Sequence, residues 1–258
     1  MGLLNISAEI NRHETSAVFD TGAALCCLSA SFAQSCDVEV LPGVAHTAGS
    51  AKNDVTIRIG LAKELKLGSN TFHNVVFGVL ADEDLTFRQI GYRINAIIGF
   101  PVISQLGCLR LRSGSIDIVP STGSGDVDRP DFIVDDQSII VRVNYEGTDL
   151  SFLLDTGSDS TYLTPRCLQR FPALVEKASK STHSLAGAGG GQEETIYEVP
   201  AFSCKIGGSK CFLQKVELHT VAHFANSDVD GVVGQDLLQK NGFGINFRTL
   251  QFRLLDTQ

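Results

Sequence analysis

Two aspartates in this chain stand in matching local sequences and could carry acid–base chemistry. Asp20 and Asp155 each end an apolar run, and each is followed by Thr-Gly. Such a turn leaves the carboxylate at a loop tip, where Gly22 or Gly157 permits a sharp bend and a close backbone N–H. If two such carboxylates meet within about 3 Å, they share one proton, so that one serves as base and the other as acid.

The two aspartates belong to a sequence that is written twice. Residues 17–23 (AVFDTGA) recur as residues 152–158 (FLLDTGS), and residues 96–99 (AIIG) recur as residues 231–234 (GVVG). The offset is 135 residues for both pairs of segments, so that each aspartate precedes its partner glycine by 79 residues. Two matches held at one offset across half of the chain indicate an internal duplication.

The duplication predicts two lobes, residues 1–119 and residues 131–258. Residues 120–130 between them contain two prolines and two glycines, show no apolar periodicity, and are interpreted as a linker. Short helices are predicted at residues 165–169 and after Gly99 and Gly234.

Both lobes are predicted to be mainly β. The predicted strands are rich in β-branched residues or alternate in polarity, at 3–10, 16–19, 55–59, 75–80, 139–145, 150–154, 195–199 and 215–218. Many short strands with few helices predict an all-β chain of closed or folded-over sheets.

The composition excludes some classes of partner. Apolar residues make up 43% of the 258 residues, enough for a real core. The formal net charge of −8 argues against nucleic acid or an anionic membrane surface as the main partner. No run approaches the roughly 18 apolar residues of a membrane span, so none is expected. The apolar pattern begins at Leu3 without a basic leader, so we expect any native leader to have been removed.

The cysteines and histidines predict no metal site. The seven cysteines include no CxxC spacing. Cys204 and Cys211 flank a turn signal and could face each other across a hairpin, either bonded or as buried thiols. His219 and His223 would share a helix face, but the residues between them favour helix weakly and include no acid. They are interpreted as core or solvated histidines, and no cofactor is predicted.

The paired loops resemble those of the pepsin-like and retropepsin-like aspartic peptidases, and the resemblance covers both halves of the chain. Asp-Thr-Gly-Ala, ending at Ala23, is typical of retropepsins, whereas Asp-Thr-Gly-Ser, ending at Ser158, is typical of pepsins. The compact chain is most similar to the retropepsin-like type, including tandem-duplicated bacterial proteins.

The resemblance implies a fold and an activity. Two acid-protease-type β-barrel lobes would be related by a pseudo-twofold axis, with an active cleft between them. Asp20 and Asp155 would be the catalytic dyad of an aspartic endopeptidase acting on polypeptides. Thr21 and Thr156 would hydrogen-bond across to the opposite loop, and Gly22, Gly157 and Ser158 would support the dyad. The resemblance also suggests an exported, periplasmic or envelope location.

The two dyad loops are expected to differ in protonation. The Ser158 hydroxyl could donate a hydrogen bond to Asp155, which favours the ionised carboxylate, while Ala23 cannot do this for Asp20. Asp155 is therefore predicted to be the ionised partner and Asp20 the protonated one.

A hairpin that closes over substrate is expected in each lobe. The glycine-rich residues 187–191 are the predicted tip in the second lobe, and residues 45–50 correspond to them in the first. A histidine stands at the start of each region, and both His46 and His183 are interpreted as polar residues of the flap base. Pepsins carry a flap tyrosine, which is missing here, so a retropepsin-like pair of flaps is favoured. The predicted flap residues are Ala48, Gly49, Ser50, Gly187, Gly189 and Gly190.

Other functions remain open at this level. A peptide-binding or scaffold module could keep the same fold without turnover. The glycine run could suggest a phosphate loop, but it lacks the Lys-Ser/Thr and the following helix. A dyad could also form between two chains. Because the repeat gives one chain both aspartates, a monomer is expected.

Overall fold

The computed structural model describes residues 3–47, 55–87, 91–120, 129–187, 190–221, 228–240 and 242–255. Strands make up 56% and helices 15%, arranged as two closed six-stranded barrels in tandem. The predicted all-β, two-lobed fold is therefore confirmed. Among the described residues, no helix is long and apolar enough to cross a bilayer.

The first lobe is a barrel closed by its first strand. Its sheet follows the order β1-β2-β10-β3-β7-β6-β4, and β1 also pairs with β6, which closes the circle. The strands are β1 (Asn5–Ile10), β2 (His13–Phe19), β3 (Cys27–Ser29), β4 (Glu39–Val40), β5 (Ala45–Thr47), β6 (Val55–Leu67), β7 (Asn70–Leu80), β8 (Thr86–Phe87), β9 (Tyr92–Arg93) and β10 (Ala96–Ile98). Short helical turns cover it: α1 (Ala30–Ser35), η1 (Asp82–Leu85), α2 (Phe100–Ile103) and η2 (Ser104–Leu106).

The second lobe repeats this plan with longer hairpins. Its order is β13-β14-β15-β20-β16-β19-β18-β17, and an extra β14–β18 pairing closes the barrel. The strands are β13 (Phe132–Asp135), β14 (Ser138–Tyr145), β15 (Thr148–Leu154), β16 (Tyr162–Leu163), β17 (Ser179–Gly187), β18 (Gly190–Ile206), β19 (Ser209–His219) and β20 (Gly231–Val233). Its helical turns are α3 (Pro165–Arg170), η3 (Pro172–Val175) and α4 (Asp236–Lys240).

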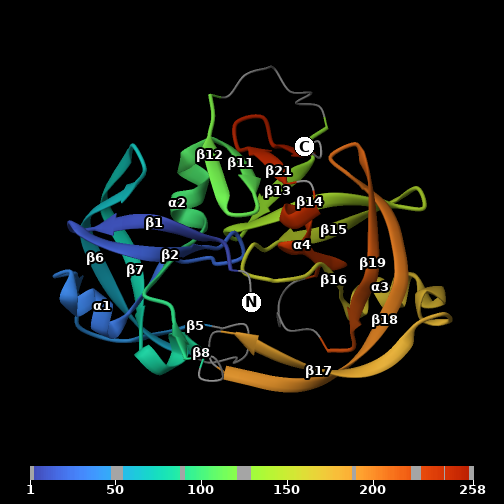
Figure 1. The fold of residues 1–258 in the computed structure, drawn as a ribbon, viewed down its shortest axis with the longest axis horizontal. Coiled ribbons are helices and arrows are strands. Elements are labelled where there is room, and N and C mark those ends of the chain that lie inside the picture. Colours follow the sequence, from blue (N-terminus) through green and yellow to red (C-terminus); the bar gives the residue numbers. More distant parts are fainter. Residues whose placement is uncertain are drawn as a thin grey trace.

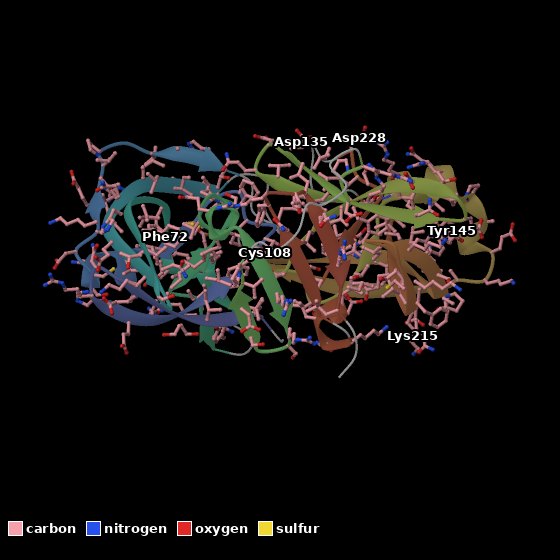
Figure 2. The ribbon with its side chains drawn as sticks, turned by 90° about the horizontal axis from the view of Figure 1, so that it is seen from above. Phe72, Cys108, Asp135, Tyr145, Lys215 and Asp228 are labelled. Carbon is pink, nitrogen blue, oxygen red and sulfur yellow. The ribbon has the colours of Figure 1, made fainter. Side chains whose placement is uncertain are left out.

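A third, smaller sheet joins the two halves. It follows the order β12-β11-β21-β22, from β11 (Cys108–Arg112), β12 (Ser115–Ile118), β21 (Phe243–Asn246) and β22 (Gln251–Leu254). Figure 1 shows this sheet between the lobes. In Figure 2, Phe72 lies towards one end of the molecule and Tyr145 towards the other, with Cys108 between them. Residues 121–128 of the predicted linker lie outside the described residues.

Strand patterning explains why these segments pair as they do. In β14, Ile139, Val141 and Val143 alternate with less buried neighbours, so that one face of the strand enters the core. The turn to β19 uses Gly207 and Gly208, both at positive φ, as a tight two-residue hairpin requires.

The predicted strands and helices lie where the patterns placed them, but several strands run further, including β2, β6, β7, β18 and β19. β6 and β18 extend well beyond 55–59 and 195–199, because their polar stretches pair with β7 and β19. The predicted helices are present as α2, α3 and α4, and the first turn of α3 contains a proline.

Cys204 and Cys211 do face each other across the β18–β19 hairpin. They are register partners, both are buried, and all seven cysteines carry free thiols. Of the two alternatives, the structure therefore has buried thiols rather than a disulfide.

Candidate active site

Each predicted dyad loop begins where two parallel strands end together. β10 runs parallel to β2, and β20 runs parallel to β15. The Asp20 amide donates to Ile98 O at 3.0 Å, and the Asp155 amide donates to Val233 O at 2.9 Å. The two segments found by the repeat thus lie side by side in each lobe and fix the start of each loop.

The glycine that follows β10 or β20 must lack a side chain. A Cβ atom at Gly99 would lie 2.4 Å from Leu25 O, and one at Gly234 would lie 2.3 Å from Ser160 O. Both distances are well inside van der Waals contact with backbone atoms. The glycine at this place therefore allows close packing of the strand end against the loop in both lobes.

The two loops meet through their threonines. The Thr21 amide donates to Thr156 Oγ1 at 3.0 Å, and the Thr156 amide donates to Thr21 Oγ1 at 3.0 Å. Each hydroxyl then donates onward to the opposite lobe: Thr21 to Leu154 O at 2.9 Å, and Thr156 to Phe19 O at 2.7 Å. Both threonines are buried. The contacts are reciprocal, as a twofold relation between the lobes requires.

This arrangement brings the two aspartates together. The carboxyl groups of Asp20 and Asp155 hydrogen-bond to each other, and both residues are only partly exposed. A Cβ atom at Gly22 would lie 2.5 Å from the Asp155 carboxyl, and one at Gly157 would lie 2.6 Å from Asp20 Oδ2. Each loop glycine therefore also leaves room for the aspartate of the opposite lobe.

Backbone amides hold each carboxylate in its own loop. The Gly22 amide donates to Asp20 Oδ1 at 2.9 Å. Asp155 Oδ1 accepts from the Gly157 amide at 2.7 Å and from the Ser158 amide at 3.2 Å. These contacts aim the two side chains at each other.

Burial raises the pKa of both carboxyl groups, and the charge of Asp20 adds to the increase at Asp155. Desolvation is the main cause of the raised Asp20 pKa, and the hydrogen bond from Asp155 opposes it. The pKa of Asp155 is raised well above its ordinary value by burial and then by the nearby Asp20 charge. The pair therefore titrates as one unit that keeps a proton at a pH where isolated aspartates have lost theirs.

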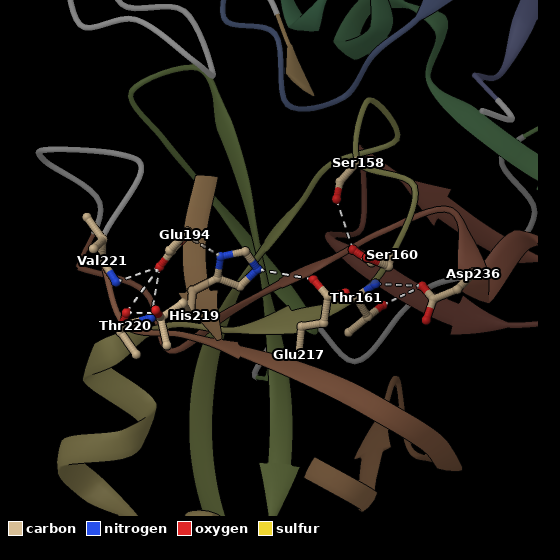
Figure 3. Close-up of polar contacts among 10 residues, drawn as sticks. Ser158, Ser160, Thr161, Glu194, Glu217, His219, Thr220, Val221 and Asp236 are labelled. Carbon is tan, nitrogen blue, oxygen red and sulfur yellow. Dashed lines mark hydrogen bonds and ion pairs between the residues drawn. The ribbon is translucent and has the colours of Figure 1, made fainter. Parts of the chain in front are cut away.

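The predicted role of the Ser158 hydroxyl is wrong. Its Oγ donates to Ser160 O at 2.9 Å, as Figure 3 shows, and only the backbone amide reaches Asp155. A short side chain that bonds its own loop is a common competitor for such contacts. The protonation order predicted from that hydroxyl therefore loses its basis, and the pKa is raised at both members of the contacting pair.

Residues just outside the motifs also support the second loop, and the sequence reading missed them. Thr161 Oγ1 donates to Asp236 Oδ1 at 2.6 Å and accepts from the Gly234 amide at 3.1 Å. Gln235 Nε2 donates to Thr156 O. The 135-residue offset makes Cys26 the counterpart of Thr161, and Cys26 likewise accepts from the Gly99 amide at 3.3 Å. The offset could therefore have identified Thr161 as a supporting residue.

The predicted flaps are only partly described. In the second lobe, β17 and β18 form a hairpin whose last register pair is Gly187 and Gly190. In the first lobe, β5 pairs with β6 up to Thr47 and Val55. Figure 1 shows β5 and β17 on the same side of the molecule. The remaining predicted flap residues lie outside the described ones: Ala48, Gly49, Ser50 and Gly189.

No metal-binding arrangement accompanies the dyad. Over the described parts of the chain, no cluster of three or more His, Cys, Asp or Glu side chains is arranged to hold a metal ion. His219 lies at the end of a strand rather than on a helix, and His223 falls outside the described residues.

Comparison with known protein families agrees with the duplication. A family model described as aspartyl protease matches the chain twice, at residues 6–102 and 141–237. The second match is displaced from the first by the same 135 residues that separate the two aspartates. No curated protein matches the chain. The two matches cover most of the sequence, and the chain belongs to the aspartyl protease family.

Proposed function

We propose that this protein is an aspartic endopeptidase in which Asp20 and Asp155 of one chain hydrolyse peptide bonds through an activated water molecule. The observation that carries the proposal is the contact between the two carboxyl groups, whose loops are held together by reciprocal threonine hydrogen bonds. Membership of the aspartyl protease family supports the same chemistry.

The raised pKa values suit a general acid and a general base that work together. The ionised carboxylate of the pair would accept a proton from water, whose oxygen attacks the carbonyl carbon of the substrate. The protonated partner would give its proton to the carbonyl oxygen, which yields a tetrahedral diol. Collapse of the diol breaks the C–N bond, and the proton taken from water moves to the leaving nitrogen. A proton returned from the diol restores the starting state of the dyad.

The two hairpins are proposed to hold an extended polypeptide against the dyad. A long antiparallel hairpin such as β17–β18 offers main-chain groups to a substrate strand. Residues 48–50 and the glycines at 187, 189 and 190 are the proposed contacts. Because both aspartates come from one chain, we propose a monomer, which a solution mass measurement would test.

Removal of either dyad carboxylate tests the proposal. Asp20→Asn and Asp155→Asn should each lower kcat/KM on a peptide library by about 10³-fold or more, because general acid–base catalysis is lost. Asp159→Asn is the matched control, since this exposed aspartate lies four residues beyond Asp155 and takes no part in the dyad. Cleavage that continues undiminished in Asp20→Asn would exclude the dyad mechanism. Peptide binding by the unmodified protein without any cleavage would indicate a binding module instead.

A further inference from the structure

A buried imidazole at the end of β19 lies between two carboxylates. His219 Nδ1 is 3.0 Å from Glu194 Oε2, and His219 Nε2 is 3.5 Å from Glu217 Oε2. A neutral imidazole donates from one ring nitrogen, whereas the imidazolium donates from both, so this geometry favours the charged form. Figure 3 shows the ring between the two glutamates.

The three residues connect the base of the second-lobe hairpin to the strand after the dyad loop. Glu194 lies on β18, and its Oε1 accepts from the amides of Thr220 and Val221 at 2.9 and 2.8 Å. The imidazole of His219 also packs on the Tyr162 ring with centroids 4.4 Å apart. Tyr162 begins β16, seven residues beyond Asp155.

Tyr162 lies close enough to the dyad for the charge of Asp155 to raise the pKa of its phenol. Its pKa is raised by burial, then by the charges of Asp155 and Glu194, so its phenol stays protonated. A cation over an aromatic ring is favourable, more so when it is shielded from water. The imidazolium of His219 is thus bound on one side by the hairpin strand and on another by a residue beside the dyad.

The first lobe fills the corresponding place with apolar side chains. Cys27 pairs with Gly78 as Tyr162 pairs with Glu217, which makes Leu80 the counterpart of His219. By the same register, Val55 on β6 corresponds to Glu194 on β18. Val55 and Leu80 are buried in one apolar cluster, with Cys27 packed against it.

This difference makes a purely structural role a poor explanation for the charged residues. Apolar packing suffices at this place in the first lobe, and a buried ion pair is often no more stabilising than apolar residues of similar size. The charged cluster of the second lobe (Glu194, Glu217 and His219) instead supplies a contact whose strength depends on protonation.

We propose that His219 is a positioning residue that fixes the base of the β17–β18 hairpin relative to the dyad loop and makes substrate binding depend on pH. The inference rests on the proposed function, because it assigns the hairpin to substrate. Within the described parts of the chain, the titratable groups shown to face the imidazole are Glu217 on its own strand, Glu194 on β18 and Tyr162 on β16.

The direction of the pH effect follows from the charge of the imidazole. Burial lowers the pKa of His219, but its two glutamates together outweigh this and leave it raised above 6.5. The contact is therefore complete below about pH 6.5 and is lost as the pH rises through the pKa of the folded protein. KM should rise over that interval, while kcat follows the dyad.

The test replaces two members of the charged cluster, Glu194 and His219, by their counterparts in the first lobe. Glu194→Val combined with His219→Leu should fold, with a free energy of unfolding equal to or above that of the unmodified protein. Its KM at pH 6 should rise by about fivefold or more with kcat changed less than about twofold, and its KM should no longer vary with His219 titration. Val55→Ala is the matched control, since it should lower stability without changing how KM varies with pH.

Two results would overturn the inference. One is a double variant that keeps the KM of the unmodified protein and its pH dependence. The other is an NMR titration in which the His219 imidazole, assigned by its loss in His219→Gln, titrates at or below 6.5. If no peptide is cleaved at all, the proposed function fails separately. The inference then depends on amide exchange at Thr195 and Ile196, which must speed up as His219 loses its proton and must not do so in the double variant.

Discussion

The two dyad loops are alike where they touch each other and differ one layer further out. The threonine contacts are reciprocal, with both amide-to-hydroxyl distances at 3.0 Å. Behind them, the Gly99 amide meets the Cys26 thiol in the first lobe, whereas the Gly234 amide meets the Thr161 hydroxyl in the second. The second lobe adds a carboxylate to this support, because Thr161 donates to Asp236.

The comparison shows which contacts the dyad requires. The atoms that set the relative position of the carboxylates obey the twofold relation, and those that only brace a loop need not. A buried thiol such as Cys26, whose pKa burial raises to about 11, stays neutral and is a weak hydrogen-bond partner. Burial also raises the pKa of Asp236, which disfavours its ionised form, and hydrogen bonds from Thr161 and the Leu237 amide oppose this increase.

The largest expected effect is on the symmetric contacts. Thr21→Val and Thr156→Val each remove a hydroxyl that makes two cross-lobe hydrogen bonds and leave buried partners unsatisfied. Each should lower the free energy of unfolding by about 2–4 kcal/mol, as measured by urea denaturation. Thr→Ser at the same positions keeps the hydroxyl and should recover most of the loss. If the two valine variants differed by several kcal/mol, the two threonine contacts would not be energetically equivalent.

The dyad itself should cost stability at neutral pH. Both aspartates have a raised pKa in the folded protein, so their favourable contribution is complete below their ordinary pKa of 3.8 and is lost as the pH rises through the folded values. Asp20→Asn combined with Asp155→Asn should therefore be more stable than the unmodified protein at pH 7, by about 1.4 kcal/mol per unit of pKa increase. The gain should vanish near pH 3.8 in thermal unfolding series, and an equal gain at every pH would contradict this account.

Cys26 and Thr161 support the two loops at corresponding positions, and exchanging their side chains tests whether the two supports are equivalent. Thr161→Cys gives the second lobe the brace of the first and leaves Asp236 without its hydroxyl donor, so we expect a loss of about 1–2 kcal/mol. Cys26→Thr places a hydroxyl beside the Gly99 amide, where it does not meet a carboxylate like that of Asp236. This variant should change the free energy of unfolding by less than about 1 kcal/mol. Urea denaturation of the two variants measures the difference, and equal effects would show that the second lobe gains nothing from Asp236.

The smallest effect is expected where the loops differ by one hydroxyl. Ser158→Ala converts the second loop to the Asp-Thr-Gly-Ala of the first. Because the hydroxyl bonds Ser160 O and not the dyad, the pH profile of kcat should stay in place, with a stability loss of about 0.5–1.5 kcal/mol. If the acidic limb of the kcat profile shifted by a full pH unit in this variant, the Ser158 hydroxyl would have to act on the dyad after all.

Much of this fold follows from periodicity and repetition. The 135-residue offset identified both loops, their parallel strands and the glycines that must lack side chains, because those features depend on local sequence and backbone sterics. The Ser158 error has a different origin. A hydroxyl chooses among neighbouring acceptors according to its rotamer, which depends on loop geometry that sequence spacing does not define.

Long-range pairing was the other feature beyond the reach of sequence. The pairing of β11 with β21, and the closeness of His219, Glu194 and Tyr162, arise from barrel closure and strand register. Single residues carry no signal for these, because a strand pattern specifies its buried face but not its neighbour.

The sheet that joins the two halves bears on what the connecting segment does. β11 and β21 pair along four residues from Cys108 to Leu111, and the threonine contacts hold the lobes at a second place. Because the two halves belong to one chain, each is held at a high local concentration around the other. Loop-closure entropy changes slowly with length, so doubling the number of residues between two such halves costs about 0.6 kcal/mol. The number of residues between the lobes can therefore vary at little cost, whereas the distance between the lobes is fixed by these contacts.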